Sequence, residues 1–203
     1  MESNRSDLLH MILLFAVILG LAATLLRARL THRTLKISSL KWEWLVILSV
    51  IPQILAFYVP STGKYLPESI LPVLQILSMF GLLVFGVINF LTPGFKALSL
   101  GLACNFLVIL SNGGWMPISV ETLKHMMPAH PEEYWTIGER LGLTKDRILL
   151  PAETHFVWLS DRFTLPPGLP QNIAFSLGDI FISIGAFFLL WSLSRKEDEK
   201  EKT

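Results

Sequence analysis

Two aspartates beside apolar sequence are the first candidates for chemistry in this chain. Asp179 opens the apolar run "FSLGDIFISIGAFFLLWSL", and Asp161 lies upstream in "LSDRF". An acid at the edge of an apolar run either caps a helix or pairs with a cation, or it keeps a proton at a raised pKa and takes part in acid–base chemistry. The pattern Ser176-Leu-Gly-Asp179 fits a helix cap, and Asp161 fits a turn residue that either pairs with Arg162 or accepts hydrogen bonds from backbone N–H groups.

Histidines and glutamates between residues 121 and 155 are a second candidate group, for a metal ion. They are His125, His130, His155, Glu121, Glu132, Glu133 and Glu153. No H-x-x-x-H or HExxH spacing places two of these ligands on one helical face, so we expect no metal site. The sequence also lacks a G-x-S-x-G elbow and a phosphate-binding glycine loop, and we expect no cofactor.

The composition indicates a membrane protein. Of 203 residues, 52% are hydrophobic and 16% are charged, whereas soluble domains carry about 25% charged residues. The net charge of +1 provides no basic field for nucleic acid. Cys104 is the single cysteine, which excludes a disulfide framework within the chain.

Apolar windows in the sequence are long enough to cross a bilayer core of roughly 30 Å as helices. We therefore predict an all-α fold, a polytopic bundle of about five spanning helices in a single integral membrane domain over residues 1–203. The predicted spans are about 8–26, 42–60, 69–91, 96–113 and 174–194. An extracytoplasmic lid region of about 114–172 joins spans four and five, and a tail of 195–203 follows the last span.

The connector "RARLTHRTLKISSLK", from Arg27 to Lys41, fixes the expected orientation. It carries five basic residues and no acid, which is typical of a cytoplasmic loop. The first span lacks the leading positive cluster of a signal peptide, so we expect it to be retained. These signals predict a multi-pass protein of the cell (inner) membrane, with its N-terminus outside and its C-terminus in the cytoplasm.

The end of the fourth predicted span and the region that follows it hold the candidate binding residues. In "SNGGWMPIS" two consecutive glycines and Met116-Pro117 end the preceding helix and allow a tight or re-entrant backbone. We take Asn112, Gly113, Gly114 and Arg162 as candidates for ligand binding, because function tends to lie on connections that a rigid scaffold positions.

Two short amphipathic helices are expected in the same region. "SVETLKHMM" fits a helix with Ser119 as its cap. "HPEEYWTIGERLGL" fits a second helix with Pro131 at its first position and Gly142 at its end.

The segments "SNGGWMPIS", "LSDRFTLP" and "FSLGDIFISIG" resemble a family of small bacterial integral membrane proteins known as a domain of unknown function. This resemblance covers most of the chain from the third predicted span onward. It implies a bacterial cell membrane and names no activity.

The spacing of Asp161 and Asp179 is also similar to that of two aspartates in the lipoprotein signal peptidases. In that family the first aspartate lies near the outer membrane face, and the second belongs to a Phe-Asn-x-Ala-Asp pattern that opens the last span. Here Ser176 and Gly178 replace the asparagine and alanine. The resemblance implies a catalytic pair, Asp161 and Asp179, in which one carboxyl keeps a proton while the other polarises a water molecule.

Two classes of function follow from these patterns. In the first, a membrane protein without assigned chemistry binds or acts on a lipid-linked or membrane-anchored ligand at the outer face. In the second, a membrane-embedded aspartyl hydrolase or peptidase-like enzyme uses Asp161 and Asp179. The membrane lipid bilayer is a partner in both, and nucleic acid is a partner in neither.

Overall fold

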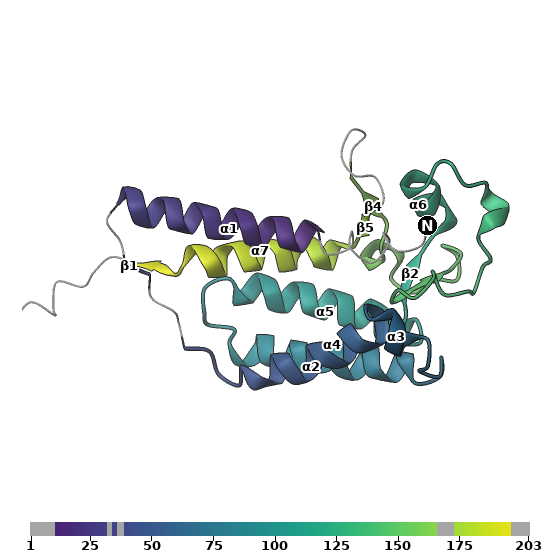
Figure 1. Cartoon of the computed structure of the whole chain (residues 1–203), viewed down its shortest axis with the longest axis horizontal. Coiled ribbons are helices and arrows are strands. Elements are labelled where there is room, and N and C mark those ends of the chain that lie inside the picture. Colours follow the sequence, from purple (N-terminus) through teal and green to yellow (C-terminus); the bar gives the residue numbers. More distant parts are fainter. Residues whose placement is uncertain (1–10, 32–33, 36–38, 166–172, 196–203) are drawn as a thin grey trace, which may run out of the picture.

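The computed structural model describes residues 11–31, 34–35, 39–165 and 173–195, and most of these residues are helical (Figure 1). The long helices are α1 (Met11–Leu30), α2 (Trp44–Phe57), α4 (Leu71–Ile88), α5 (Phe95–Ser111) and α7 (Leu177–Trp191). The short helices are α3 (Pro60–Gly63), α6 (Val120–Met126) and the 3-10 turns Glu132–Tyr134 and Val157–Leu159. The strands are β1 (Thr34–Leu35), β2 (Met116–Ile118), β3 (Asp146–Ile148), β4 (Phe163–Thr164), β5 (Ala174–Phe175) and β6 (Ser194–Arg195).

The long helices lie side by side in the order α1, α7, α5, α4 and α2 (Figure 1). Helix α7 packs against both α1 and α5, and α4 packs against both α5 and α2. Helix α6 and strands β2 to β5 gather at one end of this row. We call this the polar end; it consists of residues 58–70, 112–165 and 173–176.

Charged side chains are scarce along the long helices. Helices α2 and α4 contain none, α5 has Lys96 in its first turn, and α7 has Asp179 in its first turn. Within the described residues, α4 is the one helix long and apolar enough to cross a membrane by length and composition, and α2, α5 and α7 are shorter apolar helices. Each of the five predicted spans overlaps one long helix, and membrane crossing itself stays a prediction.

Glycines allow the backbones of α5 and α7 to approach closely. A Cβ atom on Gly101 would lie 2.4 Å from the carbonyl oxygen of Gly178, and a Cβ atom on Gly185 would lie 2.6 Å from the backbone nitrogen of Leu98. Small residues at such crossings let helices pack backbone to backbone, and any side chain would force them apart. The first turn of α7, which carries Asp179, is therefore fixed against α5.

The chain segments that follow α1 and α7 meet at the end of the row opposite the polar end. Strand β1 pairs with β6 in antiparallel register, with Thr34 opposite Arg195. At the same end the Asn89 side chain accepts from the Lys41 N–H at 2.8 Å and donates to the Lys41 carbonyl at 2.9 Å. The predicted tail from residue 196 lies outside the described residues, as does the segment 166–172 of the predicted lid region.

The prediction of an all-α fold describes the helical row and is incomplete for the polar end. There β2 and β3 form a parallel pair, and β4 and β5 form an antiparallel pair. The helix expected after Ser119 is confirmed as α6, and the Ser119 hydroxyl accepts from the Thr122 N–H at 3.1 Å.

The prediction of a second amphipathic helix, from Pro131 to Gly142, is wrong. Pro131 is extended, and only the 3-10 turn Glu132–Tyr134 forms before the chain turns at Gly138, whose φ is +87°. The Gly138 N–H donates to the Ile148 carbonyl at 2.7 Å, and the Ile148 N–H donates to the Glu139 carbonyl at 2.9 Å. Backbone pairing with β3 thus replaces the hydrogen bonds of the expected helix.

Candidate functional site

The polar end is built around β2, which leaves α5 through a glycine turn. Gly113 and Gly114 have φ values of +69° and +87°, a left-handed conformation that glycine adopts at little cost. Strand β2 then pairs with β3 on one side, and Ile118 forms a β-bridge with Asp161. The Asp161 N–H donates to the Pro117 carbonyl at 3.1 Å. Three segments that are distant in sequence therefore lie side by side.

Asn112 fastens another loop to the end of α5. Its amide nitrogen donates to the His155 carbonyl at 2.9 Å, and its amide oxygen accepts from the His155 N–H at 2.9 Å. Gly114 packs tightly on Pro72, where a Cβ atom would lie 2.5 Å from the proline ring. Asn112, Gly113 and Gly114 thus shape the polar end, and their role in ligand binding stays a prediction.

A buried ion cluster joins the loop before β3 to the segment that carries Asp161. The Lys145 Nζ donates to the Asp161 Oδ2 at 3.0 Å and lies 3.5 Å from the Asp146 Oδ1. Asp161 and Asp146 are each only 1% exposed. The Oδ1 atom of Asp161 is buried without a hydrogen-bond partner among the described residues. One cation therefore faces two buried carboxylates, so the fully ionised cluster carries one excess negative charge.

The surroundings shift the pKa values of Lys145 and Asp161 upward. Burial alone lowers the pKa of Lys145, but the charges of Asp161, Asp146 and Asp179 together hold it well above the ordinary value for lysine. Burial raises the pKa of Asp161 well above its usual range; Lys145 opposes this shift, while Asp146 and Asp179 add to it. The cluster thus keeps its lysine charged and favours a proton on Asp161.

Arg162 does not pair with Asp161, so the expectation of a local ion pair is wrong. The two side chains leave the chain in different directions: Asp161 is buried against Lys145, while Arg162 is exposed. The guanidinium carbon of Arg162 lies 4.2 Å from the centre of the Trp158 ring, which is 70% exposed. Within the described chain Arg162 forms no ion pair. It is therefore a cation available to a ligand.

Asp179 caps α7, as its sequence pattern indicates. The Ser176 Oγ accepts from the Asp179 N–H at 3.0 Å, and the Asp179 Oδ2 accepts from the Ser176 N–H at 2.9 Å. Asn105 on α5 completes the arrangement: it donates to the Asp179 Oδ1 at 2.8 Å, and its own oxygen accepts from the Ser176 hydroxyl at 2.9 Å. This closed set of bonds ties the start of α7 to α5.

The two aspartates of the predicted catalytic pair each have their own partners. Among the described residues, no hydrogen bond joins Asp161 to Asp179. Their charges are nevertheless close enough that Asp179 contributes to the raised pKa of Asp161. Catalysis by this pair stays a prediction, because substrate binding can draw such groups together.

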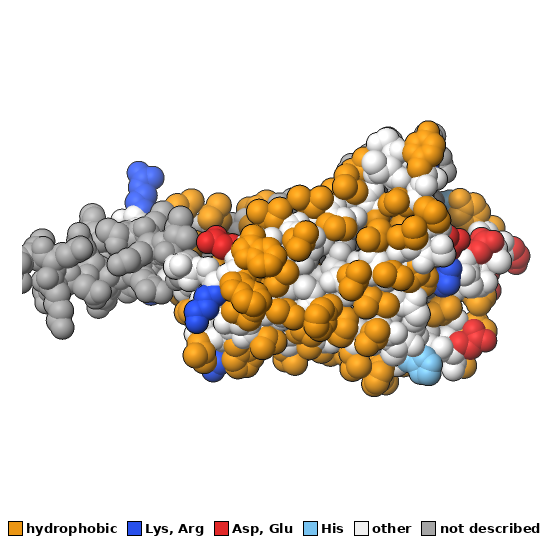
Figure 2. All heavy atoms as spheres, turned by 90° about the horizontal axis from the view of Figure 1, so that it is seen from below, with side chains coloured by type: hydrophobic (Ala, Val, Ile, Leu, Met, Phe, Trp, Pro, Cys, Tyr) orange, Lys and Arg blue, Asp and Glu red, His pale blue; other side chains and the backbone are white. Residues whose placement is uncertain are grey.

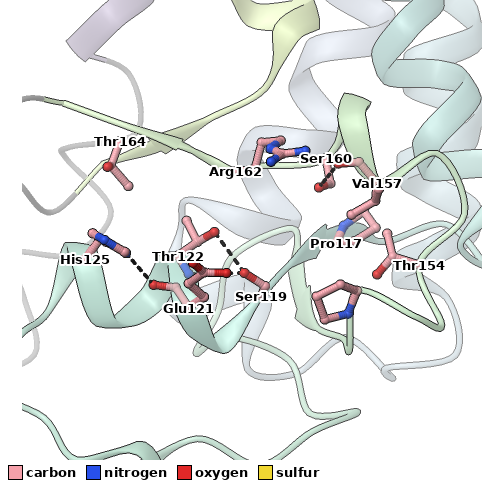
Figure 3. Close-up of a pocket in the computed structure, with 11 residues that line it drawn as sticks. Pro117, Ser119, Glu121, Thr122, His125, Thr154, Val157, Ser160, Arg162 and Thr164 are labelled. Carbon is pink, nitrogen blue, oxygen red and sulfur yellow. Dashed lines mark hydrogen bonds between the residues drawn. The ribbon is translucent and has the colours of Figure 1, made fainter.

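An open cavity of about 420 Å³ lies beside Arg162 (Figure 3). Glu121, Thr122 and His125 of α6 face the segment that carries Ser160, Arg162 and Thr164 across it. The remaining lining residues are Pro117, Ser119, Pro151, Thr154 and Val157. The His125 Nδ1 is 2.8 Å from the Glu121 carbonyl oxygen. The cavity thus combines a cation that has no ion pair in the described chain with hydroxyl groups and a carboxylate.

The described histidines of the polar end do not assemble with acids into a metal-binding group. Over the ranges that the structure describes, no three His, Cys, Asp or Glu side chains are placed to hold a metal ion. His125 lines the open cavity, the His155 backbone is hydrogen-bonded to Asn112, and the His130 ring is tilted against the Tyr134 ring with ring centres 4.6 Å apart.

Lys145 and Asp146 are the functional candidates that sequence reasoning missed. They occur as a Lys-Asp pair in "LTKDRILL", which reads as a solvated turn. Their burial depends on the β2–β3 pairing and on Asp161 from a separate segment, and no local pattern carries that information. The one available signal was the apolar "RILL" that follows, which indicates a buried strand.

These features define a mostly helical protein in which a row of apolar helices carries a polar end with a buried ion cluster and an open cavity. Residues 37–191 match the family of unknown function DUF5317, and the chain belongs to this family. No curated protein and no solved structure matches the chain. The predicted resemblance to a family of unknown function is thereby confirmed. The bacterial membrane that it implies and the similarity to lipoprotein signal peptidases stay predictions.

We predict that Lys145→Met destabilises the protein by about 3–5 kcal/mol, because it leaves two buried carboxylates without their cation. Lys145 lowers the pKa of Asp161, so its removal raises that pKa further. A carboxyl with a raised folded-state pKa contributes stability at low pH that is lost as the pH rises. In the wild-type protein this loss is complete once the pH passes the folded-state pKa of Asp161, so the deficit of Lys145→Met is expected to grow as the pH rises above that pKa.

Denaturant unfolding in detergent across a pH series measures this effect. Lys124→Met is the matched control, since Lys124 pairs with Glu132 at an exposed position and its loss is expected to cost less than about 1 kcal/mol at every pH. A deficit for Lys145→Met that equals the control, or that does not change with pH, would contradict the role of the cluster.

Proposed function

We propose that this protein is an integral membrane protein whose polar end binds the headgroup of a membrane-linked ligand at the outer face. The observation that carries the binding site is Arg162, an exposed cation without an ion pair in the described chain, at the wall of a hydroxyl-lined cavity. The proposed location is the cell membrane of a bacterium.

The outward faces of the helices support a membrane environment. Large apolar side chains are widely exposed there; Ile47 on α2 and Leu77 on α4 are each 61% exposed. Figure 2 shows hydrophobic side chains covering most of the helical part of one face, with charged side chains mainly toward its ends. Apolar surface of this extent is unfavourable in water and favourable against lipid.

Helix length and aromatic positions agree with this environment. Helix α4 has 18 residues, which corresponds to about 27 Å at a rise of 1.5 Å per residue, close to the roughly 30 Å of a bilayer core. Exposed tryptophans lie at both ends of the helical row. Trp42 precedes α2 and Trp44 is its first residue, while Trp158 lies at the polar end. Amphipathic aromatic rings favour the two membrane interfaces.

The distribution of basic residues supports the proposed orientation. Arg27 and Arg29 lie in the last turn of α1, Lys41 lies in the connection to α2, and Arg195 follows α7 at the same end of the row. Positively charged connections remain in the cytoplasm during insertion. The polar end then faces outward, with the N-terminus outside and the C-terminus inside.

The chemistry of the cavity favours an anionic headgroup that also carries hydroxyl groups. Arg162 lies over Trp158, which holds the guanidinium at the cavity wall and leaves its N–H groups free for an oxyanion. Thr154, Ser160 and Thr164 line the same cavity and provide hydroxyl groups for further hydrogen bonds. Asp161 follows Ser160 directly and is anchored by Lys145, so the ion cluster fixes this wall of the cavity.

We predict that a photo-crosslinking amino acid at Thr154 captures a membrane lipid or lipid-linked molecule in native membranes, and that Arg162→Gln lowers the yield at least about tenfold through loss of a charge-assisted bond. Mass spectrometry of the adduct identifies the ligand class. The same amino acid at Glu133, which is exposed and outside the cavity, is the control. An equal yield at both positions, or a yield unaffected by Arg162→Gln, would contradict the proposal.

A membrane-embedded aspartyl hydrolase is the second candidate, and one observation favours it. Asp161 is buried, its Oδ1 atom has no hydrogen-bond partner among the described residues, and its pKa is raised, as expected for the carboxyl that keeps its proton in a catalytic pair. Asp179 would be the second carboxyl of that pair. Its two oxygens already accept hydrogen bonds in the helix cap, which explains its presence without catalysis.

Asp179→Asn separates the two candidates. Asparagine keeps one of the two acceptors, so a capping role predicts a loss of about 1 kcal/mol in unfolding free energy and normal function. We expect a strain that carries this variant at wild-type membrane levels to have wild-type lipid and lipoprotein profiles by mass spectrometry. If the same lipid or lipoprotein accumulates in a strain that lacks the protein and in the strain with Asp179→Asn, the result supports catalysis and contradicts the binding proposal.

A further inference from the structure

We propose that the polar end holds a second ligand site, for a phosphate group or a similar oxyanion, between Arg140 and Arg147. Both arginines line a cavity of about 640 Å³ together with Lys64, Glu68 and Glu139. This cavity shares no lining residue with the one beside Arg162. The inference therefore stands apart from the function proposed above.

The two arginines are held together by the backbone. Arg140 and Arg147 are direct partners in an antiparallel β-bridge, a position in which like charges destabilise the pair. Their guanidinium carbons lie 5.6 Å and 4.7 Å from the centre of the same Trp115 ring, and Arg140 also lies 5.2 Å from the Phe57 ring. Contact with the rings offsets part of the repulsion and gathers two cations at one wall of the cavity.

The carboxylates of the chain neutralise this pair only in part. The Arg147 Nη2 donates to the Glu68 Oε1 at 2.8 Å, whereas Arg140 has no ion pair within the described residues. Arg140 donates from Nε to the Thr144 carbonyl at 2.6 Å and from Nη2 to the Leu143 carbonyl, so both bonds end on neutral backbone. Burial lowers the pKa of Arg140, because removing the guanidinium from water disfavours its charged form.

Donor groups remain for a ligand. The Arg147 Nε is buried without a hydrogen-bond partner in the described chain, and the Nη1 group of Arg140 takes part in no hydrogen bond there. A buried donor such as the Arg147 Nε is normally paired. Planar guanidinium groups bind phosphate through paired N–H donors, and three cations face two carboxylates around the cavity. A compact anion would satisfy these donors and remove the repulsion between the arginines.

The connection between α2 and α4 places this cavity beside the helical row. Lys64 and Glu68 lie between α3 and the start of α4, next to Leu71 in the cavity wall. An oxyanion can therefore reach the site as the headgroup of a phospholipid or as free phosphate. Both sources present the same group to the arginines, and the experiment below distinguishes them.

Native mass spectrometry of the full chain in detergent provides the test with three probes. They are dioctanoyl phosphatidylglycerol, inorganic phosphate and dioctanoylglycerol, which has the same tails without phosphate. Every variant also carries Arg162→Gln, so that the other cavity contributes little to phosphate binding. We expect a phosphate-bearing probe to bind, and Arg140→Gln to weaken its binding at least about tenfold.

Glu68→Gln keeps the test independent of folding defects. It removes the carboxylate that competes for Arg147 and is expected to tighten binding by up to about fivefold, which a merely structural arginine pair would not do. Lys124→Gln removes equal charge from an exposed position outside the cavity and is expected to leave the affinity unchanged.

The outcomes assign the source or overturn the site. Binding of phosphatidylglycerol without inorganic phosphate assigns a lipid headgroup, and similar binding of both assigns a free oxyanion; each upholds the site. The site is overturned if neither phosphate probe binds, or if dioctanoylglycerol binds as well as phosphatidylglycerol. It is also overturned if Arg140→Gln and Glu68→Gln both leave the affinity unchanged.

Discussion

Charge is confined to the ends of the helical row, and the rest of the architecture depends on this constraint. Helices α2 and α4 carry no charged side chain, and the charges of α5 and α7 lie in their first turns. Helices with apolar outer faces cannot use ion pairs to hold one another. Glycines perform this task instead: Gly101 and Gly185 let the backbones of α5 and α7 touch. The chemistry is therefore limited to residues at the ends.

At the polar end, the aspartates and the arginines occupy different positions for a physical reason. The carboxylates of Asp161 and Asp146 are buried, and the cost of burying them is offset by Lys145. Asp179 is likewise satisfied by the cap of α7. Arg162, and the arginine pair at Trp115, instead line cavities with donors to spare. The aspartates thus hold the end together, while the arginines keep N–H donors for the anionic ligands that we propose.

Local patterns predicted the features that depend on neighbouring residues. Apolar windows located the long helices, and the capping patterns at Ser119 and Ser176 gave the starts of α6 and α7 correctly. Features that depend on distant segments escaped prediction. The pairing of Lys145 with Asp161 requires β2 to lie between their segments, and the helix expected from Pro131 gave way to backbone bonds with β3. Neither outcome is encoded in a short window of sequence.

Whether the polar end stands on the outer side of a membrane is most directly tested by labelling single cysteines in intact bacterial cells. After replacement of Cys104 by alanine, one cysteine is placed at exposed Glu133 of the polar end or at exposed Lys96 of the opposite end. We predict that a membrane-impermeant maleimide labels Glu133→Cys in intact cells and Lys96→Cys only after permeabilisation. Equal labelling at both positions, or the reverse order, would contradict the account.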